Sequence, residues 1–231
     1  GPFAPALWPA LEEIDRMVGE LRDAIRVEDP RAAICIVSDH GFAPVTNVLW
    51  LDAALVKAGL ITLKGQGTTV EPAGVGEWVA QSWPAGGSAA IVLKNPDDRV
   101  AREKVKLFLD RLAPDPANGI AAILDPDAIA RMGGAPRAHF WVDMKPGFMI
   151  SPTLQPSIVS VVSARGTHGY SPQHAEMGAT FIVAGQGIRA QHNLGTIDMR
   201  SIAPTLAKLM GVELPSAEGP ALEVFETRTT R

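Results

Sequence analysis

Residues 32–42 have the sequence AAICIVSDHGF, and this stretch indicates the fold class. Six consecutive apolar residues, Ala32 to Val37, show no polar alternation, which is typical of a strand buried on both faces of a parallel sheet covered by helices. The polar tetrapeptide SDHG follows at once. In open α/β sheets, ligands bind just beyond the carboxyl ends of the strands. This position marks Asp39 and His40 as candidate site residues.

Asp39 and His40 have the side chains of metal ligands. A carboxylate beside an imidazole suits zinc, manganese or iron, and we expect Gly41 to let the backbone turn so that both side chains aim at one point. In the alternative interpretation, Asp39 caps a helix and His40 only occupies a loop. A second cluster, GTHGY at 166–170, also follows an apolar stretch. It favours the metal site and adds His168 as a candidate ligand.

The composition is that of an ordinary globular protein. The chain has 231 residues, of which 46% are hydrophobic and 20% charged, enough for one large domain or two small ones. The formal net charge of -4 argues against a nucleic-acid-binding surface. The single cysteine, Cys35, lies in the apolar run and is expected to be an inert packed thiol. No apolar run approaches the ~20 residues of a membrane span.

Periodicity predicts the elements on either side of the first cluster. Apolar residues recur at helical spacing over residues 11–25 and predict an amphipathic helix whose stripe packs on the sheet. Further on, the pattern predicts several shorter elements. These are a helix at 51–58 stopped by Gly59, strands at 60–63, 157–163 and 179–184, and a closing helix at 199–210 stopped by Gly211.

Residues 65–152 differ from both flanks because glycine and proline are frequent there, for example at Gly65, Gly67 and Pro72. Short strands and helices alternate in this segment, which suggests a small inserted α/β subdomain. The expected strands are 89–93, 120–124 and 139–144, and the expected helices are 100–112 and 126–132. Residues 1–64 and 153–231 would then form a metal-binding α/β core. We interpret His139 as a packing residue and not as a ligand.

Taken together, SDHGF at 38–42, GTHGY at 166–170 and the apolar run 179–187 with its following helix resemble the type I phosphodiesterase/nucleotide pyrophosphatase family of the alkaline phosphatase superfamily. Each motif is moderately specific alone. Their order, with 128 positions between the two histidines, makes the combination strong. The resemblance implies an alkaline-phosphatase-like core, a mostly parallel sheet covered by helices, of which this chain holds part.

The resemblance also implies a chemistry. Proteins of this family use two zinc ions to hydrolyse small-molecule phosphate esters through a covalent threonine or serine intermediate. Carried over by motif, Asp39 and His40 would bind the metal that activates the nucleophile, and His168 would bind the other. The two metals would clamp the phosphoryl oxygens and stabilise the charge on the entering and leaving groups.

The sequence also departs from the family. In the family, the nucleophile and the remaining metal ligands come from an N-terminal half whose motifs do not occur in this sequence. We expect Gly1-Pro2 to lie just past them; in the alternative interpretation, these two residues are the remnant of a tag that only mimics this junction. Neither Thr167, in the second cluster, nor Ser38, expected to hydrogen-bond the backbone, is a substitute. The isolated chain should therefore be inactive and need its missing half as a partner.

Three alternatives stay open at this point. The chain could be a catalytically dead metal- or ligand-binding module of the same fold, or part of a phosphonate or phosphomonoester hydrolase of the same superfamily. The loops of His40 and His168 could also lie apart and serve only packing.

Overall fold

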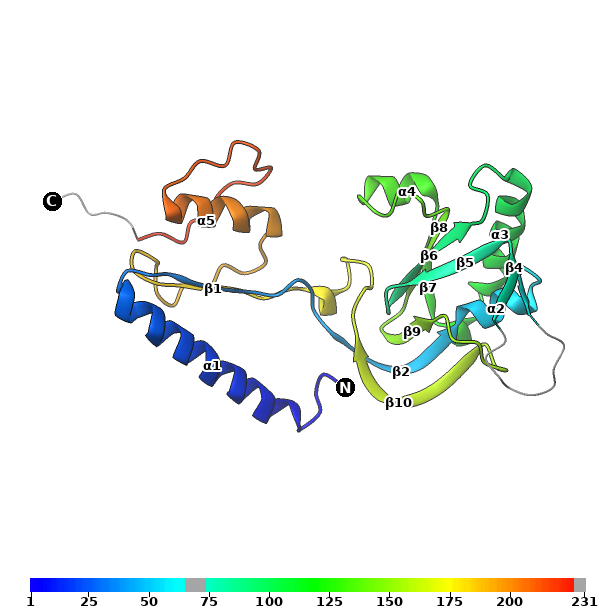
Figure 1. The fold of residues 1–231 in the computed structure, drawn as a ribbon, viewed down its shortest axis with the longest axis horizontal. Coiled ribbons are helices and arrows are strands. Elements are labelled where there is room, and N and C mark those ends of the chain that lie inside the picture. Colours follow the sequence, from blue (N-terminus) through cyan, green and yellow to red (C-terminus); the bar gives the residue numbers. More distant parts are fainter. Residues whose placement is uncertain (65–73, 227–231) are drawn as a thin grey trace. The chain divides into compact units, whose positions relative to one another are not determined.

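The structure, a computed structural model, describes residues 1–64 and 74–226 (Figure 1). Gly65, Gly67 and Pro72, at the start of the predicted insertion, lie outside the described residues. The chain divides into two compact units. Unit 1 comprises Gly1–Ala10 and Ser38–Thr180, and unit 2 comprises Leu11–Val37 and Phe181–Arg231. The predicted insertion at 65–152 falls within unit 1, and its boundaries stay a prediction.

Unit 1 contains a three-stranded sheet in the order β10-β2-β9, which ends beside the second cluster. Its central strand β2 (Ala43–Trp50) pairs antiparallel with β10 (Val159–Thr167) and parallel with β9 (Gly147–Ser151). Strand β2 directly follows the first cluster, and β10 directly precedes His168. Because Thr167 faces Ala43 in the register, the pairing of β2 with β10 brings the two clusters to the same end of this sheet.

A second, four-stranded sheet of unit 1 is entirely antiparallel, in the order β5-β6-β8-β7. Strand β6 is buried along its whole length, as its apolar sequence predicts. The members of this sheet are β5 (Ala80–Pro84), β6 (Ser88–Leu93), β7 (Ile120–Leu124) and β8 (Phe140–Met144). The short strands β3 (Ile61–Leu63) and β4 (Val75–Trp78) pair separately.

Helices α3 and α4 of unit 1 begin where the sequence supplies an aspartate cap. Asp98 and Asp125 each accept a hydrogen bond from a backbone N–H of the first turn that follows, which starts α3 and α4. Helix α3 buries Val105, Leu109 and Leu112 of the apolar face that its spacing predicts, whereas Val100, which the same spacing places on that face, is exposed. The helical segments are α2 (Leu51–Lys57), α3 (Arg99–Leu112), α4 (Pro126–Arg131), and the 3-10 turns η1 (Pro116–Asn118) and η2 (Ala175–Met177).

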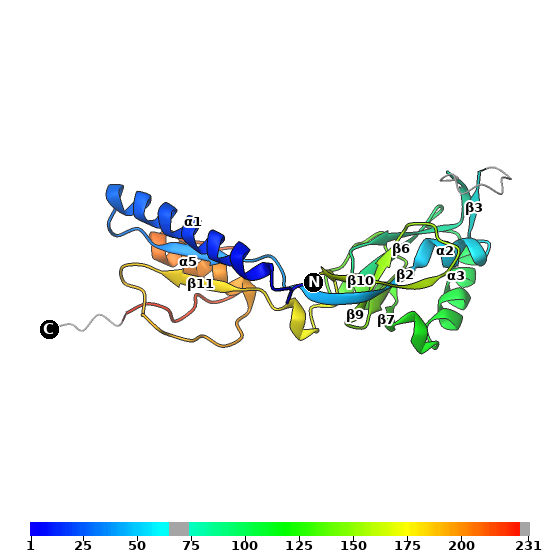
Figure 2. The same ribbon diagram turned by 90° about the horizontal axis from the view of Figure 1, so that it is seen from below.

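Unit 2 holds a two-stranded antiparallel ribbon of β1 (Ile34–Val37) and β11 (Phe181–Ala184). Its helices are most of α1 (Leu7–Glu28), the 3-10 turn η3 (Met199–Ser201) and α5 (Ile202–Met210). The closing helix ends at Gly211, as predicted. Figure 2 gives a second view of the same elements. None of the helices in residues 1–64 and 74–226 has the length and apolar character needed to cross a membrane.

The prediction of a mostly parallel sheet is wrong, although the mixture of helices and strands is confirmed. Among the described residues, β2 with β9 is the single parallel pair. Strand β1 is not buried on both faces, since Ile36 is 39% and Val37 54% exposed. An apolar run indicates a strand that favours burial. The run does not specify how many strands pair with that strand, or whether they run parallel or antiparallel to it.

The first helix forms as predicted, but the prediction that its apolar stripe packs on the sheet is wrong. Helix α1 forms as expected, but none of its residues is buried, and the apolar side chains of its stripe are exposed, among them Leu11, Ile14 and Leu21. The two-stranded ribbon of unit 2 offers much less surface than the broad sheet on which the stripe was expected to pack. The amphipathic pattern therefore identified the helix but not its partner.

Candidate metal centre

The first cluster is held by the segment that leads into β11. The Ser38 backbone N–H donates to the Thr180 carbonyl at 3.0 Å, and the Thr180 N–H donates to the Ser38 hydroxyl at 2.8 Å. The Gly41 N–H donates to the Met177 carbonyl at 3.1 Å. The prediction that Ser38 hydrogen-bonds the backbone is confirmed, and these bonds fix the backbone on both sides of Asp39 and His40.

Gly41 is needed for close approach and not for a sharp turn. Its φ lies outside the left-handed region, which contradicts the reason that we predicted for this glycine. A Cβ at this position would lie 1.9 Å from the carbonyl oxygen of Glu176. The missing side chain therefore lets residues 40–42 lie directly against η2.

The second cluster is held by the turn between β5 and β6. The Gly87 N–H donates to the His168 carbonyl at 2.7 Å, and the Ser88 hydroxyl donates to the Gly169 carbonyl. Gly169 has a φ of 81°, and a Cβ there would lie 1.8 Å from the Ala85 carbonyl oxygen. The turn at 85–88 belongs to the predicted insertion, so that segment directly supports the loop that carries His168.

The structure brings His40 and His168 together. Their ring centroids lie 3.9 Å apart and the ring planes differ by 10°, so that the two imidazoles stack. The ring of Phe42 lies beside that of His168, with the two centroids 6.4 Å apart. Two histidines 128 positions apart in the sequence thus share one site, which excludes the alternative that their loops are separate.

The tautomer of His40 leaves one ring nitrogen available to a metal. Its Nδ1 lies 2.8 Å from the Gly41 carbonyl oxygen, which can only accept, so Nδ1 carries the proton and Nε2 presents its lone pair. Nε2 lies 3.5 Å from Oδ2 of Asp39. In a tetrahedral site with zinc–ligand bonds of about 2.0–2.2 Å, two ligand atoms are roughly 3.4 Å apart. Asp39, 87% exposed at its side chain, and His40 therefore fit one metal ion together.

The donors present fit part of a metal centre and not all of one. A catalytic zinc ion normally has three protein ligands and one open position. Within residues 1–64 and 74–226, no group of three or more His, Cys, Asp or Glu side chains could hold an ion. Asp39 and His40 supply two donors and His168 supplies one, so each ion of a two-metal site would need further ligands.

The remaining predictions near the site concern side chains without a metal role. His139 lies within 3.4 Å of the Leu93 backbone N and 3.2 Å of the Pro96 carbonyl oxygen, which agrees with a packing role. Thr167 is buried at the end of β10. Burial raises the pKa of the Cys35 thiol, which disfavours the reactive thiolate, as expected for an inert cysteine.

Sequence reasoning missed Asp143 and His174. The Asp143 carboxylate is 5% exposed and accepts a hydrogen bond from the Ser171 backbone N–H at 2.8 Å. Nε2 of His174 lies 3.1 Å from its other oxygen. The available signal was one charged residue inside the apolar strand sequence FWVDM of β8, because a carboxylate is rarely buried without a partner.

Tyr170 supports the second cluster as a hydrogen-bond donor. Its hydroxyl donates to the Phe148 carbonyl at 2.6 Å. Burial, together with the negative charges of Glu176 and Asp143, raises the pKa of Tyr170 to about 12. The phenol therefore stays protonated at neutral pH and is a structural contact between the His168 loop and β9.

This pKa leads to a prediction that is easy to test, because Tyr170 is the single tyrosine of the chain. We expect ultraviolet titration of the folded protein to show tyrosinate only as the pH approaches 12, and the urea-unfolded chain to titrate near 10. A group whose pKa is raised on folding stabilises the fold below its unfolded pKa and loses that contribution as the pH rises through the folded one. Titration of the folded chain near 10 would show that the phenol is not held as described.

Comparison with known proteins places these motifs in a family. Residues 1–171 match the family described as Type I phosphodiesterase / nucleotide pyrophosphatase. The chain belongs to this family. The match covers both clusters, so the type I phosphodiesterase family assignment includes the loops of His40 and His168. A search of curated protein sequences gave no match.

Solved structures of the family share the fold of this chain. Human ectonucleotide pyrophosphatase/phosphodiesterase 5 matches with a TM-score of 0.67 and 19% identity, over 96% of this chain and 51% of that one. The murine protein of the same name matches with a TM-score of 0.65 and 20% identity, over 95% and 51%. An inactive variant of the murine protein in complex with AMP also matches, with a TM-score of 0.65 and 18% identity, over the same shares. The present chain spans about half the length of these relatives.

Proposed function

We propose that this chain carries the metal-binding loops of a zinc-dependent phosphoester hydrolase that acts on phosphodiesters or nucleotide pyrophosphates. The observation that carries the proposal is the stacking of His40 on His168 at 3.9 Å, from two motifs far apart in the sequence. Membership of the type I phosphodiesterase family supports it. The murine relative bound to AMP supports a nucleotide-like phosphate ester as the substrate class.

Each loop would have a separate task. Asp39 and His40 would hold one metal ion, and the Gly41 carbonyl would keep His40 in the tautomer that ligation requires. His168 would contribute to the second ion, on a loop held by the backbone of Gly87. Bound metal ions would supply Lewis-acid stabilisation of the charge on the phosphoryl oxygens.

The attacking group would come from elsewhere in the protein. The Ser38 hydroxyl accepts from the Thr180 backbone N–H, and Thr167 is buried, so neither hydroxyl suits nucleophilic attack beside the two histidines. Because the relatives are about twice as long as the matched region, we propose that the rest of their fold supplies the nucleophile and the missing metal ligands.

Zinc titration followed by NMR of the histidine ring nitrogens tests the metal site in the chain itself. We expect the signals of His40 and His168 to shift first among the five histidines. With only two donors for one ion and one for the other, binding should be weak. The shifts should vanish in acid, because a ligating imidazole must be unprotonated.

The signals of His139 and His192 provide internal controls, since neither belongs to a candidate donor group. An Asp39→Asn variant should further weaken the response of His40 and leave the response of His168 in place. Equal shifts of all five histidines, or a response of neither His40 nor His168, would contradict the proposed metal site.

The absence of a three-ligand cluster among the residues that the structure describes also agrees with a second candidate function, a catalytically inactive metal- or ligand-binding module of the same fold. The two candidates differ in one measurable property. Only a hydrolase should turn over a phosphodiester when the remaining half of the family fold is supplied.

A further inference from the structure

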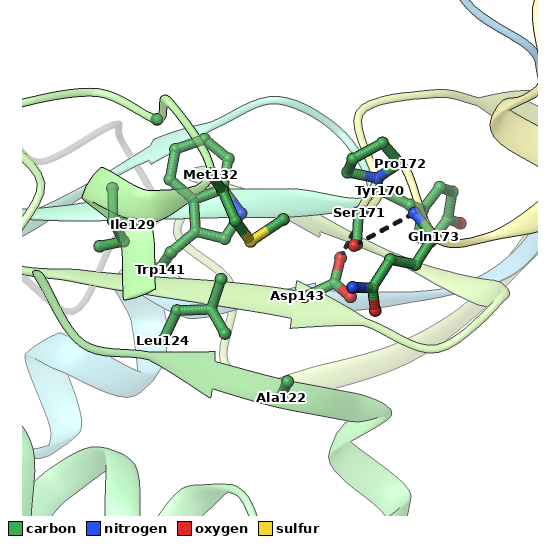
Figure 3. A pocket seen from close by; sticks show the side chains of 11 residues that line it. Ala122, Leu124, Ile129, Met132, Trp141, Asp143, Tyr170, Ser171, Pro172 and Gln173 are labelled. Atoms are coloured by element: carbon green, nitrogen blue, oxygen red, sulfur yellow. Dashed lines mark hydrogen bonds between the residues drawn. The ribbon is translucent and has the colours of Figure 1, made fainter. Parts of the chain in front are cut away.

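A pocket of about 250 Å³ opens beside the second cluster in unit 1 (Figure 3). Apolar side chains line one side of it, among them Leu124, Ile129 and Trp141. Polar groups of Asp143, Ser171 and Gln173 line the other side. Small-molecule sites typically combine a mostly apolar wall with a few placed polar groups, as this pocket does.

The polar side of the pocket belongs to the loop that carries the candidate metal ligand. Consecutive Cα atoms are 3.8 Å apart, so the Cα of Tyr170 lies within about 8 Å of that of His168, and the Cα of Ser171 within about 11 Å. The Tyr170 hydroxyl and the Ser171 N–H tie this stretch to Phe148 and Asp143. The pocket therefore shares Tyr170 and Ser171 with the loop that carries His168, and hydrogen bonds hold both residues to neighbouring strands.

The size and shape of the pocket suit a small aromatic group. An apolar cavity of about 150 Å³ accommodates benzene, so a volume of about 250 Å³ has room for a fused two-ring system. The indole of Trp141 forms part of the wall and offers an aromatic surface for stacking, and Leu124 and Ile129 extend the apolar contact.

Asp143 adds a chemical preference to that shape. A carboxylate has about four lone-pair sites. The Ser171 N–H and His174 occupy one on each oxygen, so further O–H or N–H donors can still bind. A buried carboxylate repels a phosphate group but favours a neutral donor. The phosphate group of a phosphate ester would therefore bind at the loops of His40 and His168, and the neutral part of the ester would bind in the pocket.

We propose that this pocket binds the alcohol portion of the substrate, a neutral aromatic or heteroaromatic group with a hydrogen-bond donor that reaches Asp143. The inference rests on the proposed function, because it places the phosphoryl group at the loops of His40 and His168. It adds the class of alcohol, which neither the family nor the relatives assign to these residues.

Binding of 2-naphthol to the chain without metal tests the inference. This neutral two-ring alcohol matches the pocket in size and carries one donor. We expect saturable binding of 2-naphthol by fluorescence titration, and at least about tenfold weaker binding of 2-methoxynaphthalene, which lacks the donor. Trp141→Ala should weaken the binding of 2-naphthol at least about tenfold. Trp83→Ala is the matched control, because Trp83 lies in the same unit but does not line this pocket.

Two further variants keep the test decisive if the loss of Trp141 disturbs folding. Ala122→Leu adds volume at the pocket wall without removing a contact, and should also weaken binding. Asp143→Asn should reduce the preference of 2-naphthol over its methyl ether. Binding that is absent in the wild-type chain, or that is unaffected by both Trp141→Ala and Ala122→Leu, would overturn the inference.

This result is independent of the proposed hydrolytic function, since the assay needs neither metal nor turnover. If zinc perturbs His40 and His168 but 2-naphthol does not bind, only the pocket assignment fails. If 2-naphthol binds as expected and zinc perturbs neither histidine, the pocket is a ligand site and the proposed metal centre fails.

Discussion

Alone, the 231-residue chain is expected to hydrolyse a chromogenic phosphodiester no faster than the uncatalysed background. In the proposed site, its described residues would supply two donors for one metal ion and one for the other, and these residues contain no cluster of three. Two-metal catalysis requires both ions, which stabilise the attacking and the leaving oxygen atoms. The chain also lacks a hydroxyl suited to attack near His40 and His168 in the part that the structure describes. Release of nitrophenolate from a bis(nitrophenyl) phosphate measures this directly.

Supplying the other half of the family fold, fused or as a separate chain, should restore zinc binding and turnover together. In that reconstituted protein, His168→Ala should lower the rate by roughly a thousandfold or more. That factor corresponds to about 4 kcal/mol of transition-state stabilisation, a reasonable share for a metal ion that contacts the phosphoryl group. A chelator should have an effect of the same size.

His139→Ala is the matched control, because the ring nitrogens of His139 lie within hydrogen-bond distance of backbone atoms of Leu93 and Pro96 and not of the candidate metal ligands. Brisk hydrolysis by the chain alone, with one zinc ion or more bound tightly, would show that the account of missing ligands is wrong. A reconstituted protein that binds zinc and remains without turnover would favour the inactive binding module.

The sequence predicted those elements whose beginnings and ends are determined locally. Helix α3 has an aspartate cap and a clear apolar face, and strand β7 was predicted with its observed bounds. By contrast, the sequence did not reveal β2, although it is the central strand of its sheet. Pro44 argues against a strand interior, but it lies near the start of β2, where a missing N–H is tolerated.

Properties that depend on distant partners could not be predicted. The apolar run of β1 suggested a parallel, fully buried strand, and its only neighbour among the described strands is the antiparallel β11. The stripe of α1 likewise specified a buried face without identifying a surface to bury it. Apolar patterning reports the preference of a segment for burial, whereas the pairing and the burial achieved depend on the other segments present.

The meeting of the two candidate histidines was predicted better than the fold around them, and their role as metal ligands stays a prediction. Two short motifs contain Asp39, His40 and His168, and the residue types of these motifs indicate metal ligation. The structure brings the two histidines together. Asp143 and His174 escaped prediction because 31 positions separate them and no motif surrounds either one. Only the pairing of β8 and the path of the loop after His168 reveal that they meet.

Gly169→Ala should lower the stability of the chain by about 3 kcal/mol or more. Two costs add at this position. The left-handed backbone, with φ of 81°, disfavours any residue that has a Cβ by about 1–2 kcal/mol. The new Cβ would also lie 1.8 Å from the Ala85 carbonyl oxygen and 2.8 Å from its carbon, so the turn at 85–88 must move. Backbone atoms cannot rotate away as the end of a side chain can, so this overlap is relieved only by breaking the contacts of that turn.

Gly133→Ala separates the two costs. Gly133 has a similar φ of 68°, but a Cβ there meets no atom within 4 Å. It should therefore lose only the 1–2 kcal/mol of the left-handed conformation. The difference between the two variants in urea denaturation measures the steric part of the effect.

The position of Gly169 also links stability to the candidate metal site. A shift of the turn would break the bond from Gly87 to the His168 carbonyl, and His168 would move away from His40. We therefore expect Gly169→Ala, and not Gly133→Ala, to reduce the zinc-induced shifts of both histidines at concentrations where the variant is still folded. Equal destabilisation by the two substitutions, with unchanged zinc shifts, would show that the close packing of the turn against the His168 loop is not what determines the geometry of the site.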